Sequence, residues 1–123
     1  MAHILVVDDD DAQRDVLRRL LENRGHEVEV AADGLEALNL VGAMSFDVAI
    51  VDMYMPRMDG LQLIPKLRVQ SAHTKVVAMS GGVFGGKGKD LLSEARRLGA
   101  ERTLEKPFGT DELTEVLEEL VGS

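Results

Sequence analysis

The chain has 123 residues, the usual size of one domain, and we expect residues 1–123 to fold as a single domain. Acidic residues outnumber basic ones 22 to 14, and the net charge of -8 argues against direct binding to nucleic acid and favours a cation or a basic partner. The absence of cysteine excludes disulfides and thiolate metal sites, and the lack of a signal-peptide pattern or a membrane-length apolar run leads us to expect a cytoplasmic protein with no membrane segment.

Two kinds of pattern alternate along the chain. Short apolar or alternating runs predict β-strands, and apolar residues at helical spacing predict α-helices. In chain order, the first half predicts strand 3–7, a helix with inward residues from Val16 to Leu21 that ends before Gly25, strand 26–32, helix 35–44, strand 46–53, and a helix from the N-cap Asp59 to about Val69. Pro65 would kink the last of these helices if it lies beyond the first turn.

The second half of the chain continues the alternation. It predicts strand 75–80, a glycine-rich segment, helix 91–98 closed by Gly99, a strand at about 101–105, and helix 110–121 with Thr110 as its N-cap. Parallel strands need crossover connections, and these are right-handed. Five strand–helix units therefore predict an α/β domain, with a parallel sheet covered by helices on both faces.

The notable polar residues fall at the carboxyl ends of the predicted strands. Asp8 and Asp9 follow the first strand, Asp52 ends the third, Ser80 ends the fourth, and Lys106 follows the fifth. In open α/β sheets these ends line the ligand crevice, at the point where the strand order reverses. We therefore expect three carboxylates, one hydroxyl and one ammonium to converge there.

Such a group of side chains suggests a metal ion and phosphoryl chemistry. Two carboxylates about 4 Å apart repel each other by roughly 4 kcal/mol at an effective dielectric constant near 20, and a divalent cation relieves this repulsion. Oxygen-only ligands favour Mg²⁺ or Mn²⁺, and the three histidines lack metal-ligand spacing. A lysine and a hydroxyl beside such an ion can neutralise a phosphoryl group, and a carboxylate there can be its acceptor.

Four short motifs occur in order at these strand ends. They are VVDD (6–9), VDMYMP (51–56) with Gly60 after it, MSGG (79–82) and KPF (106–108). Together they resemble the receiver domains of two-component response regulators, and the resemblance covers essentially the whole chain. It implies a doubly wound, five-stranded parallel sheet in the order 2-1-3-4-5 with five helices, a flavodoxin-like or CheY-like fold.

The resemblance also implies roles for the residues that match the motifs. Asp52 would be the phosphoacceptor. Asp9, Asp52 and the backbone carbonyl of Tyr54 would bind Mg²⁺ directly, with Mn²⁺ as a possible substitute, and Asp8 would act largely through a water molecule. Ser80 would hydrogen-bond the phosphoryl group.

Lys106 would pair with the same phosphoryl group, and the Lys106–Pro107 peptide bond would be cis. A sensor histidine kinase or a phosphotransfer protein would be the donor in a phosphorelay, and phosphorylation would change binding to a downstream protein that the sequence does not name. The chain would be a signalling protein that catalyses only its own phosphorylation and slower hydrolysis. Thr103 stands where many family members carry a switch Tyr or Phe, which departs from the pattern.

Three other interpretations compete with this one. An acidic run after a strand is most often a solvated loop or helix start, and we expect Asp10 and Asp11 to be one early loop residue and one N-cap. The run VVDDDDA also fits the start of haloacid-dehalogenase-like phosphatases, with Asp8 as nucleophile, but this leaves Asp52 without a role. The segment 81–88 nearly matches a phosphate-binding loop, and it fails at Gly88, which has no hydroxyl. We expect it instead to be a loop whose movement reports phosphorylation.

Overall fold

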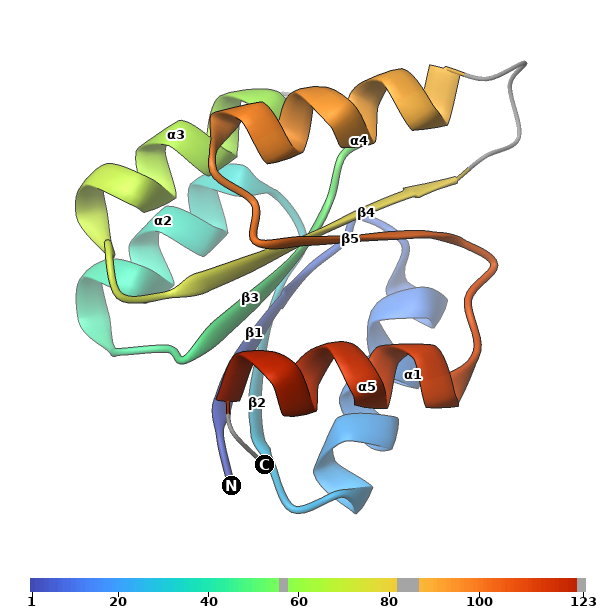
Figure 1. Ribbon diagram of the computed structural model, residues 1–123. Helices are drawn as coiled ribbons and strands as arrows, with labels where there is room; N and C mark the ends of the chain where they lie inside the picture. The colour runs from blue at the N-terminus through green and yellow to red at the C-terminus, as the bar shows by residue number, and fades with distance from the viewer. Residues whose placement is uncertain (56–57, 82–86, 122–123) are drawn as a thin grey trace.

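The computed structural model describes residues 1–55, 58–81 and 87–121, with the side chains of 87–90 excepted. Strands and helices alternate along the whole chain (Figure 1). In chain order they are β1 (His3–Val7), α1 (Asp11–Asn23), β2 (Glu27–Ala31), α2 (Gly34–Ala43), β3 (Val48–Asp52), α3 (Gly60–Gln70), β4 (Lys75–Gly81), α4 (Lys87–Leu98), β5 (Arg102–Lys106) and α5 (Thr110–Val121).

The five strands form one parallel sheet in the order β2-β1-β3-β4-β5. This confirms the predicted doubly wound fold and its strand order. β1 pairs with β2 on one side and with β3 on the other, so the strand order reverses at β1. The crevice predicted from the sequence therefore lies above the carboxyl ends of β1 and β3.

The sheet is buried on both faces because helices cover each side. Figure 1 shows α1 and α5 on one face and α2, α3 and α4 on the other. Successive residues of β1 alternate between two cores: Ile4 belongs to the same core as Leu17 of α1, whereas Leu5 belongs to the same core as Leu63 of α3. Such two-sided burial explains why the strands are nearly continuous apolar runs.

Several predicted boundaries are confirmed. The side chain of Asp59 caps α3 by accepting a hydrogen bond from the Gln62 N–H at 3.0 Å. Gly25 and Gly99 follow α1 and α4 with φ of 91° and 122°, values that favour glycine over other residues. Pro65 lies within α3 and beyond its first turn, which is the position that the sequence alone could not decide.

One predicted helix start and one predicted cap are wrong. α4 begins at Lys87 rather than at residue 91, because the Lys87–Asp90 segment continues the helix despite Gly88, whose cost in a helix is only about 1 kcal/mol. α5 spans residues 110–121 as predicted, but Thr110 is its first helical residue, and the carbonyl of Gly109 accepts the Leu113 N–H at 3.2 Å, so Thr110 is not the cap. Residues 82–86 of the predicted glycine loop lie outside the described residues.

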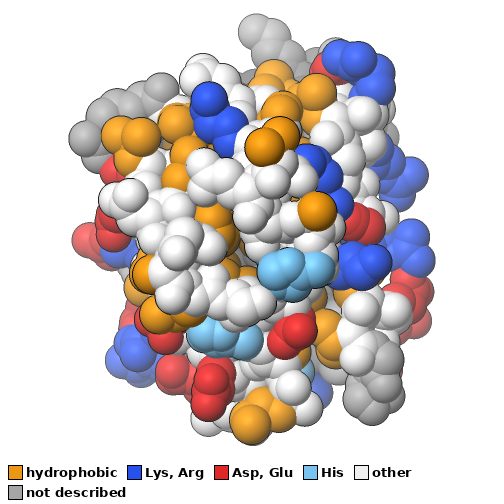
Figure 2. All heavy atoms as spheres, turned by 90° about the vertical axis from the view of Figure 1, so that its left-hand side faces the viewer, with side chains coloured by type: hydrophobic (Ala, Val, Ile, Leu, Met, Phe, Trp, Pro, Cys, Tyr) orange, Lys and Arg blue, Asp and Glu red, His pale blue; other side chains and the backbone are white. Residues whose placement is uncertain are grey.

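The opposite end of the molecule holds the connections that lead into β3 and β4. Figure 2 shows histidine side chains beside acidic ones on that face. His3 Nδ1 lies 2.7 Å from the Ser45 carbonyl oxygen, and Ser45 Oγ lies 2.7 Å from His73 Nε2, so the two connections are tied to each other and to β1. None of the helices in the described ranges is long and apolar enough to cross a membrane.

Candidate functional site

The predicted site residues lie together at the carboxyl edge of the sheet. Asp8 follows β1 directly, and Asp52 is the last residue of β3. Ser80 lies in β4 one residue before its end, and Lys106 is the last residue of β5. Their convergence follows from the topology, because β1, β3, β4 and β5 are parallel neighbours whose carboxyl ends meet at one edge.

Three carboxylates form a cluster within this edge. One carboxylate oxygen each from Asp8, Asp9 and Asp52 lies within 4.8 Å of the others. Asp8 is fully buried and Asp52 is 5% exposed, whereas Asp9 is open to solvent. The cluster therefore combines two desolvated carboxylates with one that solvent reaches, and its donors are oxygens alone, as Mg²⁺ prefers.

The ammonium group of Lys106 bonds to two of these carboxylates. Its Nζ donates to Asp8 Oδ2 at 3.3 Å and to Asp52 Oδ2 at 3.1 Å. Burial of Lys106 opposes its charge, but the negative charges of Asp52 and Asp8 outweigh burial and hold the pKa of Lys106 above its usual value. The side chain therefore stays an ammonium at neutral pH and links the end of β5 to β1 and β3.

Asp52 carries a carboxylate that is unusually basic. Burial raises the pKa of Asp52 to about 6, and the charge of Asp8 adds to this rise. The Tyr54 N–H, which donates to Asp52 Oδ1 at 2.9 Å, and Lys106 act in the opposite direction without cancelling it. Asp52 is consequently still ionised at neutral pH, but burial makes its ionised form less favourable than that of an ordinary aspartate.

Ser80 offers a hydroxyl that the fold does not use. The residue is fully buried, and its Oγ makes no hydrogen bond within the described part of the chain. A buried hydroxyl without a partner costs roughly 1–3 kcal/mol, so its retention needs a reason. The hydroxyl is therefore available to a group bound at this edge of the sheet.

The turn from β1 into α1 is held by contacts that the sequence did not predict. The Asp8 N–H donates to the Ala31 carbonyl at 3.1 Å, and the Asp10 N–H donates to Asp8 Oδ1 at 3.0 Å. Arg14 Nη1 donates to the Asp8 carbonyl at 2.7 Å. Nothing in the residue pattern signals this last bond, because its acceptor is a main-chain atom.

Asp10 and Asp11 start a helix as predicted, but neither is the loop residue that the sequence predicted one of them to be. Asp10 is the N-cap of α1, and its Oδ1 accepts the N–H groups of Ala12 and Gln13 at 3.0 and 3.2 Å. Asp11 lies in the first turn of α1 and pairs with Arg14. The four adjacent aspartates therefore divide into two that face the site and two that start a helix.

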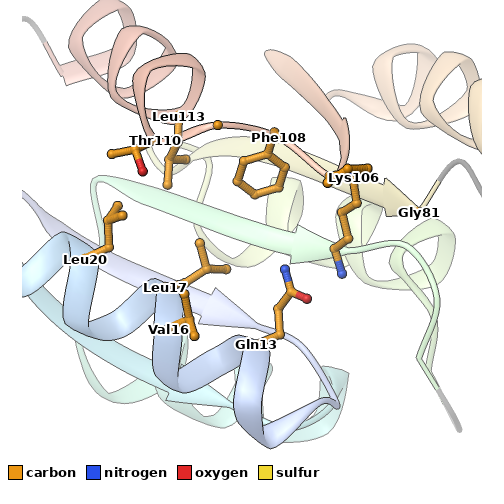
Figure 3. Close-up of a pocket in the computed structure, with 11 residues that line it drawn as sticks. Gln13, Val16, Leu17, Leu20, Gly81, Lys106, Phe108, Thr110 and Leu113 are labelled. Atoms are coloured by element: carbon orange, nitrogen blue, oxygen red, sulfur yellow. The ribbon is translucent and has the colours of Figure 1, made fainter.

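A pocket of about 420 Å³ opens beside Lys106, between α1 and the start of α5. Figure 3 shows Leu17 and Leu20 of α1 facing Phe108 and Leu113 across it, with the Lys106 side chain at one end. The Lys106–Pro107 bond in its wall is cis, which confirms that prediction. The site thus opens laterally onto a largely apolar surface.

Comparison with known proteins identifies the family. A family model described as the response regulator receiver domain matches residues 4–118. The transcriptional regulatory protein FixJ of Bradyrhizobium diazoefficiens is 35% identical over 119 residues, which cover 97% of this chain and 56% of FixJ. The chain spans about half the length of the curated relatives it matches.

Solved structures share the same architecture. Chemotaxis protein CheY4 of Vibrio cholerae has a TM-score of 0.85 and 34% identity, with 98% of each chain covered. The receiver domain of the sensor histidine kinase PA1611 of Pseudomonas aeruginosa PAO1 has a TM-score of 0.85 and 25% identity, covering 99% of this chain and 98% of that one. That structure is described with a magnesium ion coordinated in the active-site cleft.

These matches also decide between the two phosphoryl chemistries considered from the sequence. The phosphatase alternative gains no support, because the family match is to receiver domains. It also left Asp52 without a role, whereas Asp52 lies in the carboxylate cluster and bonds Lys106. The chain belongs to the receiver domains of response regulators.

Proposed function

We propose that this receiver domain accepts a phosphoryl group on the side chain of Asp52. The observation that carries the proposal is the Lys106 ammonium, which lies within 3.3 Å of both Asp8 and Asp52 in a cluster of three carboxylates. A pKa of about 6 makes the Asp52 oxygen more basic than that of an ordinary aspartate, while most of the group is still ionised at pH 7. A basic, ionised oxygen at a solvent-facing edge is suited to attack phosphorus.

The proposed reaction is transfer from a phosphohistidine. An oxygen of Asp52 forms a bond to phosphorus as the phosphorus–nitrogen bond of the donor breaks, and the imidazole leaves with that electron pair and takes up a proton. The product is an acyl phosphate on Asp52. Lys106 pairs with the phosphoryl oxygens, and the unpartnered Ser80 hydroxyl donates a hydrogen bond to one of them.

We propose Mg²⁺ as the resident ion of the carboxylate cluster, with Mn²⁺ as a substitute. Asp9, Asp52 and the backbone carbonyl of Tyr54 would be its direct protein ligands, and Asp8 would act mainly through a water molecule. The fit is supported by the donor set, which is all oxygen and carries three negative charges within 4.8 Å. When bound, the ion supplies charge that neutralises the phosphoryl oxygens during transfer.

The proposed partners follow from the family. A sensor histidine kinase or a phosphotransfer protein would donate the phosphoryl group, since the relatives are response regulators. We propose that residues 1–123 act as one receiver domain, and that phosphorylation changes its binding to a downstream protein. The domain would turn over only its own acyl phosphate.

The decisive experiment is phosphorylation by acetyl phosphate, followed on a phosphate-affinity gel with and without Mg²⁺. Wild type, Asp52→Asn and Asp8→Asn run side by side. We expect a Mg²⁺-dependent shifted band that disappears in Asp52→Asn, because an amide cannot form an acyl phosphate. A wild-type band that persists in Asp52→Asn would refute Asp52 as the acceptor, and the loss of that band in Asp8→Asn alone would move the acceptor to Asp8.

A further inference from the structure

Arg14 is a charged side chain that reaches back from α1 to the main chain of the proposed metal site. Its Nη1 donates to the Asp8 carbonyl at 2.7 Å, and its Nη2 bonds the Asp11 carboxylate. Only 16% of the Arg14 side chain is exposed. The guanidinium thus bridges the residue before the β1–α1 turn and the first residue of the helix after it.

The Asp8 carbonyl needs such a donor because it lies just beyond the end of β1. Asp8 is fully buried, and a buried carbonyl without a partner is costly. Its other polar groups are bonded to Ala31, Asp10 and Lys106. The bond from Arg14 completes this set, and it is charge-assisted, which makes it stronger than a neutral one.

We propose that Arg14 is a positioning residue for the metal site, acting through the main chain of Asp8. It fixes the turn, and the turn fixes where the Asp8 and Asp9 carboxylates stand relative to Asp52. Because Mg²⁺ demands near-ideal octahedral geometry, small displacements of these oxygens weaken its binding. This inference rests on the proposed function, since it assumes that the cluster binds Mg²⁺.

A purely electrostatic role for Arg14 predicts the opposite result. Arg14 carries a positive charge beside the cluster, and this charge repels a divalent cation. If charge were its only effect, removing it would tighten Mg²⁺ binding. The positioning role predicts weaker binding, so the sign of the change separates the two roles.

The test is a Mg²⁺ titration of Arg14→Gln, with Arg18→Gln as the matched control. Arg18 lies one turn further along α1 and pairs with Asp15 and Glu22, so its substitution makes the same charge change away from Asp8. Tyr54 is the chain's single tyrosine, the chain has no tryptophan, and the Tyr54 N–H bonds Asp52, so tyrosine fluorescence reports the site. We expect Mg²⁺ to bind about tenfold more weakly to Arg14→Gln and no more weakly to Arg18→Gln than to wild type.

A second variant and an amide-exchange measurement test the role of Arg14 independently. Arg14→Lys retains the charge but cannot bond the Asp8 carbonyl and Asp11 as a fork, so we expect it to weaken Mg²⁺ binding too, and it replaces Arg14→Gln if that variant does not fold. Amide exchange of Asp10, whose N–H bonds Asp8 Oδ1, is measured without metal and should be faster in the Arg14 variant than in Arg18→Gln.

Several results would overturn the inference. One is Mg²⁺ binding to Arg14→Gln that is equal to or tighter than wild type, and another is an equal weakening in both arginine variants. If wild type itself does not respond to Mg²⁺, the proposed metal site fails. In that case, the amide exchange still tests Arg14 separately. If Asp10 exchanges at the same rate with and without the Arg14 substitution, Arg14 does not fix the turn.

Discussion

Asp52 is a residue on which folding and the proposed chemistry make opposing demands. Burial at the end of β3 raises its pKa from an ordinary 3.8 to about 6. A raised pKa for an acid means that the ionised form is less favourable in the folded protein than in the unfolded chain, by about 1.4 kcal/mol for each pKa unit. Ionised Asp52 therefore destabilises the metal-free fold.

The first prediction is that Asp52→Asn stabilises the metal-free protein. The amide keeps an oxygen that can accept the Tyr54 N–H, and Lys106 keeps Asp8 as its partner. We expect the free energy of unfolding at pH 8 in a chelator to rise by about 1–3 kcal/mol, measured by urea denaturation.

The pH dependence of this difference follows from the same pKa. Between about pH 6 and 3.8 the folded state binds more protons than the unfolded state at Asp52, so wild-type stability gains from this residue as the pH falls through that window. The advantage of Asp52→Asn should therefore shrink towards pH 4. Asp111→Asn, at an exposed aspartate, serves as the control and should give no stabilisation. A less stable Asp52→Asn at pH 8 would contradict the reasoning.

The second prediction compares two buried serines, Ser80 and Ser71. Ser80 Oγ makes no bond in the described structure, whereas Ser71 Oγ lies 2.6 Å from Thr74 Oγ1. Ser80→Ala should leave the stability unchanged or raise it by about 1 kcal/mol while slowing phosphorylation, on the order of tenfold or more. Ser71→Ala should lower the stability by about 1 kcal/mol and leave phosphorylation unchanged. Thermal melts and acetyl phosphate kinetics measure both, and a Ser80→Ala variant that phosphorylates at the wild-type rate would argue against the role of Ser80.

At the level of elements, α3 starts unusually close to the strand that carries Asp52. The Gly60 N–H donates to the Met53 carbonyl at 3.3 Å. A Cβ at Gly60 would lie 2.9 Å from Met53 Cα and 2.5 Å from its Sδ, closer than real contacts allow. Because Met53 follows Asp52 directly, the first residue of α3 limits where the acceptor can stand.

The third prediction compares this glycine with another in a helix. Gly60→Ala should destabilise the protein by about 1–3 kcal/mol, because either the Met53 backbone or the start of α3 must move. Gly42 lies in α2, and a Cβ added there would meet nothing within 4 Å, so Gly42→Ala should stabilise the protein by about 0.5–1 kcal/mol. Urea denaturation of both variants tests the pair, and two changes of the same sign would count against this account of the packing.

The sequence predicts the helices and strands well, because apolar runs and capping residues both lie within the elements that they mark. Two-sided burial makes strands such as 48–52 apolar up to their last residue, and capping residues such as Asp59 mark helix starts directly. The start of α4 at Lys87 was missed because glycine weakens a helix locally, whereas packing along the rest of α4 decides whether it forms.

The site divides in the same way. Asp8, Asp52 and Lys106 could be placed together because strand ends and parallel topology fix their edge of the sheet. The bond from Arg14 to the Asp8 carbonyl could not be predicted, because its acceptor is a main-chain atom and any long side-chain donor in the first turn of α1 could reach it. The pKa of Asp52 also depends on burial that only the packed structure reveals.

At the scale of the whole molecule, part of the excess negative charge is gathered in the carboxylate cluster. The net charge is -8, and the cluster holds three carboxylates, of which Asp8 and Asp52 pair with the Lys106 ammonium. A cation that binds there acts only on the folded state, because the three aspartates are brought together by the sheet. Binding and stability are therefore linked.

The fourth prediction is that Mg²⁺ raises the melting temperature. At ten times its dissociation constant the ion adds about 1.4 kcal/mol, which corresponds to a shift of roughly 5 °C for a domain of this size. Sodium chloride at matched ionic strength is the control, since screening alone also reduces repulsion. The same shift with sodium chloride would show that the cluster holds no specific ion.

The distance along the chain between Asp8 and Lys106 has a consequence for a protein made from its N-terminus onwards. The two residues are 98 positions apart, and at about 5–20 residues per second the ribosome adds the lysine roughly 5–20 s after the aspartate. Until β5 is made and docks beside β4, the growing chain has the acids without their ammonium. The proposed phosphorylation of Asp52 would therefore require a chain that has been synthesised past β5, and shorter nascent chains would not be phosphorylated.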